Sequence, residues 1–400
     1  MGGSCAKLRR IAKKERKEKS MIKIFHCGDI HLDAPFSGIS PAEGRERRNS
    51  LCTRFLDMLD FAKKSRADIV LISGDLFDSG YVRAETEAKL IEAFSALDCP
   101  IVIAPGNHDP FTPDSIYASA LPENVYVFDS EECSRFDFDD IGVSVTGYAF
   151  TSEAHPERPL ADTGMIELSE SNLNLLCAHT DIFSPVSTYA PISENELAET
   201  GFAYAALSHV HKSPEIFRFG GTYAAYSGFA EGRGFDECGE GGAWLITAEQ
   251  AEGAGGIKLD FERVCTSRAR YAVEKVDITG ADSDAAAAAV IDRVIGTDTY
   301  SADVVLRIIL EGEVAMSYTP SAAAITKLTD ISAKCEIKDM TEPLYDAAYL
   351  ENDLTVKGEF YRLLAEKLSS GSAAEKRVAA EALRYGLAAM SARDIVIDGD

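Results

Sequence analysis

The chain has 400 residues, of which 46% are hydrophobic and 26% charged, and its formal net charge is −25. This length favours two or three domains, and the composition excludes fibrous and disordered classes. No apolar run approaches the roughly 18 residues that a membrane span requires, so we expect no membrane association. The nine cysteines form no CxxC pair, which argues against a disulfide framework or a thiolate metal site and favours reduced thiols in a cytoplasmic protein.

The first twenty residues differ in composition from the rest. They carry eight Lys or Arg and two Glu with no apolar segment behind them, so they are not a secretory signal. We expect residues 1–20 to be a disordered basic leader or an upstream start before Met21, with a nucleic-acid-binding arm as the alternative. Without this leader, 32 basic and 63 acidic residues remain, a net charge of −31. Such a charge repels a phosphate backbone, although metal ions or a partner subunit would supply positive charge.

Strands and helices alternate through the first half of the chain. The predicted strands are 22–27, 68–73, 100–104, 125–128, 143–148, 173–178 and 203–207. The predicted helices are 45–65 and 85–97. This alternation indicates an α/β fold, in which functional sites gather at the carboxyl ends of the strands.

Short strands without helices are predicted after residue 211, at 215–226, 243–247 and 257–264, and they suggest a second sheet packed on the first. A small α+β region follows, with strands at 271–278 and 304–310 and helices at 282–295 and 321–333. The stretch 355–390 is helical with a break at 369–372. We therefore predict a catalytic domain at 21–268, an α+β domain at 269–345 and a C-terminal helical segment at 346–400.

Five short clusters, each behind an apolar run, carry the candidate chemistry. They are Asp29-Ile30-His31, Gly74-Asp75-Leu76-Phe77-Asp78, Gly106-Asn107-His108-Asp109, His179 and His209-Val210-His211. Two carboxylates, one carboxamide and four imidazoles from this set suit two Mn, Fe or Zn ions better than Ca. One such motif alone is more often a loop or capping residue, or a histidine of the core. Five motifs in this order argue for a metal site.

The spacing within the clusters suggests how two ions are held. Asp29 and His31 are two residues apart, so in extended backbone both side chains point the same way and can hold one metal. His209 and His211 repeat this spacing and can send one imidazole to each ion. Asp75 follows a glycine in a tight turn, where its carboxylate can bridge ions about 3.5–4 Å apart.

The third cluster offers both a ligand and a proton donor. Asn107 is a neutral ligand, which leaves the positive charge of the site available to a phosphate. His108, next to it, cannot easily face the same metal, so it is placed to contact the phosphate and protonate the leaving alkoxide. Asp109 would hold the tautomer of His108 and raise its basicity.

This series of clusters resembles the calcineurin-like metallophosphoesterase superfamily, whose signature runs Asp-x-His, Gly-Asp, Gly-Asn-His-Asp, His and Gly-His-x-His. Ser208 stands where the family usually has the last Gly, and we expect only a modest backbone adjustment there. Within the superfamily, residues 21–400 resemble the SbcD-type DNA-repair exonucleases, particularly the YhaO-like subgroup. The supporting stretches are 25–35, 206–212, 226–237 and 385–387.

The resemblance implies a two-sheet αββα sandwich, with residues 269–345 as a capping domain that helps shape the DNA-binding face. It implies a metal-bridged hydroxide that attacks phosphorus, with His108 as the general acid supported by Asp109. The metal of that family is typically Mn²⁺. The implied ligands are Asp29, His31, Asp75 and His211 for one ion, and Asp75, Asn107, His179 and His209 for the other.

The resemblance therefore predicts a DNA exonuclease of DNA repair or recombination. The C-terminal helices would either dock an SMC-like coiled-coil ATPase or close the fold on themselves, and a homodimer is an expectation of the family alone. Arg233 would either meet a substrate phosphate or pair with Glu231 or Asp236. One alternative is a small-molecule or nucleotide phosphodiesterase or phosphatase, which the acidic charge favours. The other is a non-catalytic subunit of an ATPase complex, which the intact ligand set disfavours.

Overall fold

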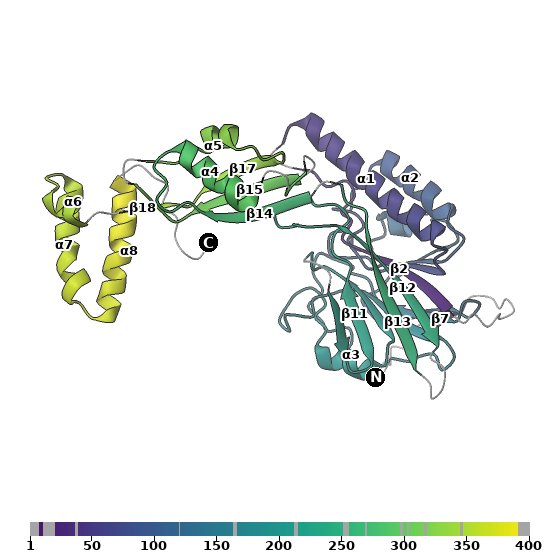
Figure 1. Cartoon of the computed structure of the whole chain (residues 1–400). Coiled ribbons are helices and arrows are strands. Elements are labelled where there is room, and N and C mark those ends of the chain that lie inside the picture. The colour runs from purple at the N-terminus through teal and green to yellow at the C-terminus, as the bar shows by residue number, and fades with distance from the viewer. Residues whose placement is uncertain are drawn as a thin grey trace. The chain divides into compact units, whose positions relative to one another are not determined.

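The computed structural model of the chain describes residues 8–10, 21–36, 39–119, 121–162, 166–211, 215–250, 256–268, 270–296, 299–301, 304–315, 318–344 and 347–390. The chain forms two compact units, Met1–Arg270 and Tyr271–Asp400 (Figure 1). The first unit ends next to the domain boundary predicted at residue 268. Among the helices of the described ranges, none combines the length and hydrophobicity of a membrane span.

The first unit is built around two sheets. The strands of one sheet are β2 (Met21–Cys27), β3 (Ile69–Ile72), β4 (Ile101–Ile103), β5 (Val125–Val127), β12 (Gly242–Gln250) and β13 (Ile257–Cys265), in the order β13-β12-β2-β3-β4-β5. The strands of the other are β1 (Leu8–Arg10), β6 (Ser134–Phe138), β7 (Val143–Gly147), β8 (Leu173–His179), β9 (Tyr204–Ser208), β10 (Ile216–Phe219) and β11 (Thr222–Tyr226), in the order β1-β6-β7-β8-β9-β11-β10.

Helices cover the outer faces of both sheets. The helices are α1 (Pro41–Lys64), α2 (Ala84–Ser95), α3 (Glu194–Thr200) and the short 3₁₀ helix η1 (Ile116–Ala118). Phe55 of α1 lies in the core between the first sheet and its helices, Val145 in the core between the two sheets, and Leu197 of α3 in the core outside the second sheet. The predicted αββα sandwich is therefore confirmed, because three separate cores divide four layers.

The middle of the first sheet follows directly from the sequence. Strands β2, β3 and β4 pair in parallel, and all four residues of β3 are buried because helices cover one face and the second sheet the other. Helix α1 begins at Pro41, earlier than the predicted residue 45, because Ser40 and Glu43 form a capping box and Pro41 occupies the first turn.

The membership of the sheets corrects one expectation. The sequence predicts that 143–148 continues the first sheet and that the strands after residue 211 form the second. Instead, β7 pairs with β8 in the second sheet, while β12 runs antiparallel along β2 from Trp244 opposite His26 to Glu249 opposite Met21. The apolar pattern of a strand reports how deeply it is buried but not which distant strand it pairs with, and this pairing joins segments more than 200 residues apart.

The predicted basic leader is described only at Leu8–Arg10. These three residues form β1, which pairs in parallel with β6 from Leu8 opposite Arg135 to Arg10 opposite Asp137. The rest of the leader lies outside the described residues, so its disorder stays a prediction.

The second unit contains a small α+β region and a set of helices. Its strands are β14 (Arg270–Asp277), β15 (Val304–Glu311), β16 (Glu313–Ala315), β17 (Lys334–Asp339) and β18 (Glu342–Leu344), and its helices are α4 (Asp284–Ile295), α5 (Ala322–Leu328), α6 (Ala347–Asn352), α7 (Val356–Ser370) and α8 (Ala373–Met390). Strands β14, β15 and β17 form one sheet, and β16 pairs with β18. The sequence did not predict β17, which begins six residues after α5 ends.

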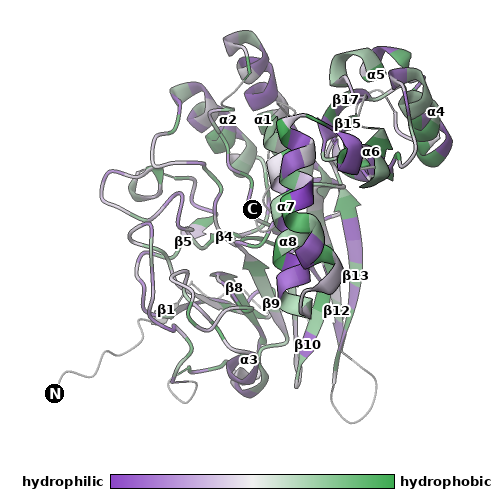
Figure 2. Cartoon of the chain, turned by 90° about the vertical axis from the view of Figure 1, so that its left-hand side faces the viewer, coloured by the Kyte–Doolittle hydropathy of each residue, from purple (hydrophilic) through white to green (hydrophobic). Residues whose placement is uncertain are grey.

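Helices α7 and α8 carry apolar residues that face solvent. Figure 2 shows hydrophobic and hydrophilic residues mixed along both helices. Leu363 of α7 is 68% exposed and Val378 of α8 is 61% exposed, whereas Leu387 of α8 is fully buried. The predicted break between them is present, because Gly371 ends α7 and α8 starts at Ala373. The division of this unit into a capping domain and a helical segment stays a prediction.

Candidate metal centre

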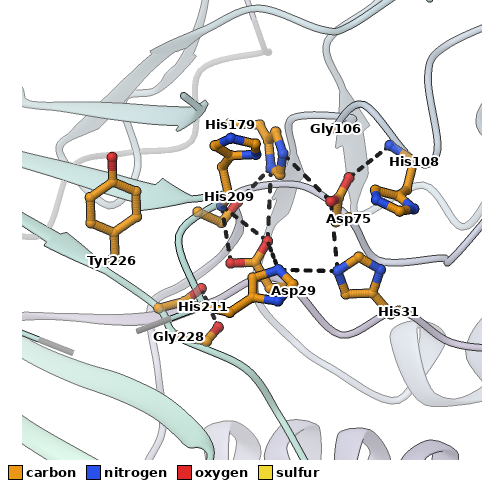
Figure 3. A network of polar contacts seen from close by, with 12 residues as sticks. Asp29, His31, Asp75, Gly106, His108, His179, His209, His211, Tyr226 and Gly228 are labelled. Carbon is orange, nitrogen blue, oxygen red and sulfur yellow. Dashed lines mark hydrogen bonds and ion pairs between the residues drawn. The ribbon is translucent and has the colours of Figure 1, made fainter. Parts of the chain in front are cut away.

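The carboxyl ends of five strands and the loops after them carry all seven predicted ligands and His108. Figure 3 shows Asp29, His31, Asp75, His179, His209 and His211 gathered with His108 in one region. Asn107 lies beside His179. The first three loops follow β2, β3 and β4 of one sheet, and the other two groups end β8 and follow β9 of the second sheet. The site therefore lies where the carboxyl ends of the parallel strands of both sheets meet, as the strand–ligand pattern predicted.

The backbone at four of these residues is left-handed. The φ angles are 50° at Asp29, 51° at His31, 48° at Asp75 and 105° at His209. Such angles cost roughly 1 kcal/mol or more at non-glycine residues and persist only where the surroundings impose them. The expected geometry was wrong here, because Asp29 and His31 were expected to converge through extended backbone and instead converge through a left-handed loop.

Backbone hydrogen bonds between the first two loops impose this conformation. The amide of Asp29 donates to the Gly74 carbonyl at 3.0 Å, and the amides of Ile30 and His31 both donate to the Asp75 carbonyl at 2.9 Å. His31 and Asp75 are therefore fixed relative to each other by main-chain bonds, independently of their side chains.

Two glycines are required by the close approach of these loops. A Cβ on Gly106 would lie 2.2 Å from Oδ1 of Asp75, and a Cβ on Gly74 would lie 2.4 Å from Nδ1 of His179. Gly74 also has a φ of 128°, which side chains rarely allow. Both glycines of the Gly-Asp and Gly-Asn-His-Asp motifs thus make room for a ligand.

Asp29, His31, Asp75 and His211 form what we call the first half-site. Each offers one donor atom, and the four atoms lie within 4.8 Å of one another. Nε2 of His31 is 3.3 Å from Nε2 of His211 and 3.6 Å from Oδ2 of Asp75, and Nε2 of His211 is 3.5 Å from Oδ1 of Asp29. Atoms bonded at about 2.1 Å to one metal lie about 3–3.5 Å apart, so this set has the spacing of a ligand shell.

Asp75, Asn107, His179 and His209 form the second half-site. Nε2 of His179 lies 3.5 Å from Oδ2 of Asp75 and 2.9 Å from Oδ1 of Asn107. The ring of His209 lies 5.0 Å from the ring of His179, and its backbone amide donates to both oxygens of Asp29 at 3.0 Å. Asp75 is the carboxylate that the two half-sites share.

The hydroxyl of Ser208 determines the tautomer of His179. It lies 2.5 Å from the Ser73 carbonyl, which can only accept, so it donates its single proton there. The same oxygen is 2.9 Å from Nδ1 of His179 and must accept from it. His179 therefore carries its proton on Nδ1, and Nε2 presents a lone pair. From the sequence, only a modest backbone adjustment was expected at Ser208. The serine also provides a hydroxyl that bonds His179, which the family's usual glycine could not do.

The second half-site consequently fits a cation. Burial lowers the pKa of His179 well below its ordinary value, so the ring is neutral. Its Nε2 lone pair faces the Asn107 oxygen, and both are acceptors with no proton between them at 2.9 Å. A divalent ion held by both atoms satisfies this pair, and Mn, Fe and Zn all accept such donors.

The carboxylate of Glu237 holds His211 in the first half-site. Its Oε1 lies 2.8 Å from Nδ1 of His211, so the ring donates there and presents Nε2 to the other ligands. Arg233 in turn binds Glu237 through Nε at 2.9 Å and binds Oδ1 of Asp78 through Nη1 at 3.0 Å. The predicted pairing of Arg233 with Glu231 or Asp236 was wrong, because its partners are Glu237 and Asp78. A substrate contact by Arg233 stays a prediction.

Burial and neighbouring carboxylates shift the pKa values of the residues in the first half-site. Burial lowers the pKa of His31 to about 4. Burial opposes charge at His211 as well, but the Asp29 and Glu237 carboxylates raise its pKa to about 10. Burial raises the pKa of Asp75 well above its usual range, and the neighbouring Asp109 and Asp29 carboxylates add to the rise. Carboxylates packed this closely favour a divalent cation among them.

His108 is oriented by a backbone group rather than by Asp109. Its Nδ1 lies 3.1 Å from the Asp78 carbonyl, and its amide donates to Oδ1 of Asp75 at 3.0 Å. Asp109 instead accepts from the amides of Gly106 and Phe77 and from the Tyr117 hydroxyl, and so holds the loop in place. The role expected for Asp109 differs from this arrangement. Burial raises the pKa of Asp109 to about 6.

Sequence reasoning missed the outer partners of the ligands. Glu237 and Ser208 each bond the second nitrogen of a ligand histidine, and Asp78 orients His108 through its carbonyl. Signals for all three were present, since Ser208 departs from the family signature, Asp78 ends the second cluster and Glu237 ends the stretch 226–237 that resembles the family. None of these signals indicated which histidine the residue would meet.

The calcineurin-like phosphoesterase family matches residues 22–213, which contain all seven predicted ligands and His108. The chain contains a calcineurin-like metallophosphoesterase domain. This family consists of metal-dependent phosphoester hydrolases, in agreement with the donor set of the two half-sites.

Curated proteins from bacteria and archaea are similar to this chain. The uncharacterized metallophosphoesterase YhaO of Bacillus subtilis is 27% identical over 60% of this chain and 60% of its own length. The DNA double-strand break repair protein Mre11 of Aeropyrum pernix is 28% identical over 52% of this chain and 53% of its own. The SbcD component of the nuclease SbcCD of Bacillus subtilis is 25% identical over 54% of this chain and 64% of its own. The chain thus spans less than two thirds of each of these relatives.

Proposed function

We propose that this chain is a two-metal phosphodiesterase that hydrolyses DNA, as an exonuclease in repair or recombination. The observation that carries the proposal is the Asp75 carboxylate, which lies in the four-residue donor cluster of the first half-site and also 3.5 Å from His179 of the second, with the exposed His108 beside them. The DNA substrate is supported by the similarity to proteins named for double-strand break repair and for nuclease activity.

The proposed ligands of one ion are Asp29, His31, Asp75 and His211, and those of the other are Asp75, Asn107, His179 and His209. When bound, divalent ions would neutralise the phosphate and lower the pKa of a bound water. The protein's own groups do the rest. Ser208 and Glu237 keep Nδ1 of His179 and His211 protonated, so that Nε2 of each ring faces the ions.

His108 is the proposed general acid. The Asp78 carbonyl can only accept, so Nδ1 of His108 donates its proton to that carbonyl. Nε2 is therefore the atom that would protonate the leaving oxygen. The ring of His108 lies 4.8 Å from the ring of His31, which places it directly beside the first half-site. In this proposal Asp109 acts by holding the loop that carries Asn107 and His108.

The test is hydrolysis with added Mn²⁺ of linear double-stranded DNA, single-stranded DNA and bis-p-nitrophenyl phosphate. His108→Ala should lower DNA digestion by about 100-fold or more, since general acid catalysis contributes roughly 10²–10⁴-fold. Tyr81→Ala, an exposed residue of the loop after β3, is the control and should digest DNA as the wild type does. Intact DNA beside rapid turnover of the small ester would contradict the DNA substrate.

A small-molecule or nucleotide phosphodiesterase is the second candidate function. The net charge of −25 favours it, because a strongly acidic protein repels the long polyanion more than a small diester. Salt dependence separates the two candidates. DNA binding through cationic contacts weakens steeply as salt rises, whereas hydrolysis of a small diester changes little.

We also propose that α7 and α8 dock a coiled-coil ATPase subunit of the SMC type. Supporting observations are the exposed Leu363 and Val378 and the similarity to a protein named as a subunit of a nuclease complex. In co-purification with such a subunit, Leu363→Glu should lose the complex, while Leu328→Glu on α5, which is also exposed, should keep it. Light scattering of the chain alone tests the homodimer, and loss of a dimer in Leu363→Glu would assign this face to a second copy instead.

A further inference from the structure

A cavity of about 430 Å³ lies against the first half-site. His211 and Val210 form part of its wall, and Phe183, Phe217 and Tyr226 contribute aromatic rings to it. Because His211 is also a ligand of the first half-site, a group in this cavity lies next to whatever is bound at the metal centre. Figure 3 shows Tyr226 on the side of the ligand cluster where His209 lies.

The cavity offers an aromatic surface that is open on one face. Phe183 stacks on Tyr226 with ring centroids 5.7 Å apart and an interplanar angle of 26°, and Phe217 meets Phe183 edge-on at 5.8 Å. Tyr226 is only 3% exposed and forms the floor, whereas Phe183 is 58% exposed. A largely exposed phenyl ring that is stacked on a buried ring is a surface on which a planar aromatic group can stack.

The position of Phe183 is fixed by hydrogen bonds on both sides of it. Oδ1 of Asp181 accepts from the amides of Phe183 at 2.8 Å and Ser184 at 3.2 Å. The Tyr226 hydroxyl accepts from the amide of Ile182 at 3.0 Å. The backbone that carries the exposed ring is therefore held in place before any ligand binds, and the ring packs on Tyr226, which lowers the entropic cost of stacking on it.

The polar groups of the cavity select the kind of ligand. Glu215 and Asp236, which are both exposed, are the acidic residues that line the cavity. Carboxylates repel a phosphate but accept hydrogen bonds from amino and imino N–H groups. Aromatic faces combined with acceptors match a nucleobase and do not match the phosphate or the sugar of the same nucleotide.

We propose that this cavity holds an unstacked nucleobase of the nucleotide whose phosphate occupies the metal centre. This inference rests on the proposed function, because it assumes that a phosphodiester is bound at the half-sites. It narrows the substrate to single strands, frayed ends or free nucleotides, since a base within an intact duplex is not available to stack on Phe183. The same cavity would serve the nucleotide alternative.

The first test compares single-stranded DNA with a matched strand whose nucleotides at both ends are abasic. The wild type should cleave the normal strand with a kcat/KM about 10-fold higher, in line with the usual contribution of a base–aromatic stack. Phe183→Ala should remove this preference by raising KM for the normal strand while leaving the abasic strand unchanged. Val186→Ala, an exposed residue of the same loop that is 87% exposed, is the control and should keep the preference.

A binding measurement separates failure of this inference from failure of the proposed function. Calorimetric titration with Mn²⁺ present should show dAMP binding about 10-fold more tightly than deoxyribose 5-phosphate, and Phe183→Ala should remove the difference. If this holds while no diester is cleaved, the cavity stands and the nuclease proposal fails. If DNA is cleaved but neither experiment shows a base preference lost in Phe183→Ala, the cavity proposal is wrong and the nuclease proposal stands.

Discussion

The two half-sites of the metal centre are held by partners of different charge. In the first half-site, His211 donates to the Glu237 carboxylate at 2.8 Å. In the second, His179 donates to the neutral Ser208 hydroxyl at 2.9 Å. A carboxylate partner makes an imidazole a stronger ligand than a hydroxyl does. The comparison teaches that two ions held at these half-sites would not be equivalent, because the groups behind the candidate ligands differ.

The ligands themselves add to this difference. The first half-site contains the Asp29 carboxylate in addition to the shared Asp75, whereas the second adds the neutral Asn107. Glu237 is firmly ionised, since its hydrogen bonds from His211 and Arg233 outweigh burial and lower its pKa to about 2. We therefore expect two classes of Mn²⁺ site, with tighter binding at the first half-site than at the second.

The largest effect should come from a change that breaks both half-sites together. In Gly106→Ala the new Cβ would meet Oδ1 of Asp75 at 2.2 Å and displace the shared carboxylate. We expect a fall of about 100-fold or more in kcat for bis-p-nitrophenyl phosphate, as for a catalytic group misplaced by about 1 Å. Gly80→Ala is the matched control, because a Cβ there meets nothing within 4 Å. Equal activity of the two variants would contradict the shared role of Asp75.

A smaller and one-sided effect is expected from Glu237→Gln. The amide oxygen can still accept from His211, but the charge is lost, so the tighter Mn²⁺ site should weaken by about 10- to 100-fold. The weaker site should keep its affinity in the same calorimetric titration. Glu240→Gln, at a carboxylate that pairs with Arg270, should leave both sites unchanged. Weakening of the second site alone would reverse the assignment of the half-sites.

Ser208→Ala should weaken Mn²⁺ binding at the second half-site, by a smaller factor than Glu237→Gln weakens it at the first. Removal of the hydroxyl takes away the acceptor that fixes the proton on Nδ1 of His179, so the tautomer is no longer imposed. We expect about 10-fold weaker binding at the second Mn²⁺ site, the lower end of the range for such partners. Ser227→Ala is a matched buried control, because its hydroxyl donates to the carbonyl of Gly228. A variant with unchanged affinity at the second site would show that Ser208 only fills space.

The smallest effect at neutral pH concerns His26, which supports the second half-site from behind. Its Nε2 lies 3.0 Å from the hydroxyl of Ser73, whose carbonyl accepts from Ser208. Burial lowers the pKa of His26 to about 3 in the folded protein, whereas it is about 6.5 in the unfolded chain. Below about pH 6.5 the unfolded state therefore binds a proton that the folded state does not, and stability falls as the pH falls toward 3.

Denaturant unfolding between pH 7.5 and pH 4, with metal removed by a chelator, measures this contribution. One such histidine contributes a slope of at most about 1.4 kcal/mol per pH unit. His26→Gln should lose that part of the slope while keeping the polar contacts of the site, and the variant and the wild type should converge in slope above pH 7. An unchanged slope in the variant would mean that other buried groups account for the acid sensitivity.

The gathering of the candidate ligands was predictable from the sequence because each of them is local to the end of a strand. A buried strand such as β3 reads as a continuous apolar run, and its carboxyl end lies at one edge of a sheet whatever the neighbouring strands are. Asp75 and Asn107 could therefore be placed at the site from their positions after β3 and β4. The same reasoning found the alternating strands and helices of an α/β fold, whereas the αββα layers were implied by the resemblance to the metallophosphoesterase superfamily.

The parts that could not be predicted depend on contacts distant in sequence. The pairing of β12 with β2 and the bond from Glu237 to His211 arise only once both sheets are assembled. The left-handed backbone of Asp29 and His31 follows from hydrogen bonds to the loop after β3, and no local pattern indicates it. Asp109 was assigned to its sequence neighbour His108, whereas it accepts hydrogen bonds from the amides of Gly106 and Phe77 and from the Tyr117 hydroxyl.

The two amides that share the Asp75 carbonyl also make the site visible without any assay of hydrolysis. Ile30 and His31 are buried, and their amide protons exchange with solvent only when the loops after β2 and β3 separate. Amide hydrogen exchange at these two positions therefore reports the integrity of the loop pair directly. A variant that loses activity with slow exchange at Ile30 and His31 has lost chemistry, whereas one with fast exchange has lost the scaffold.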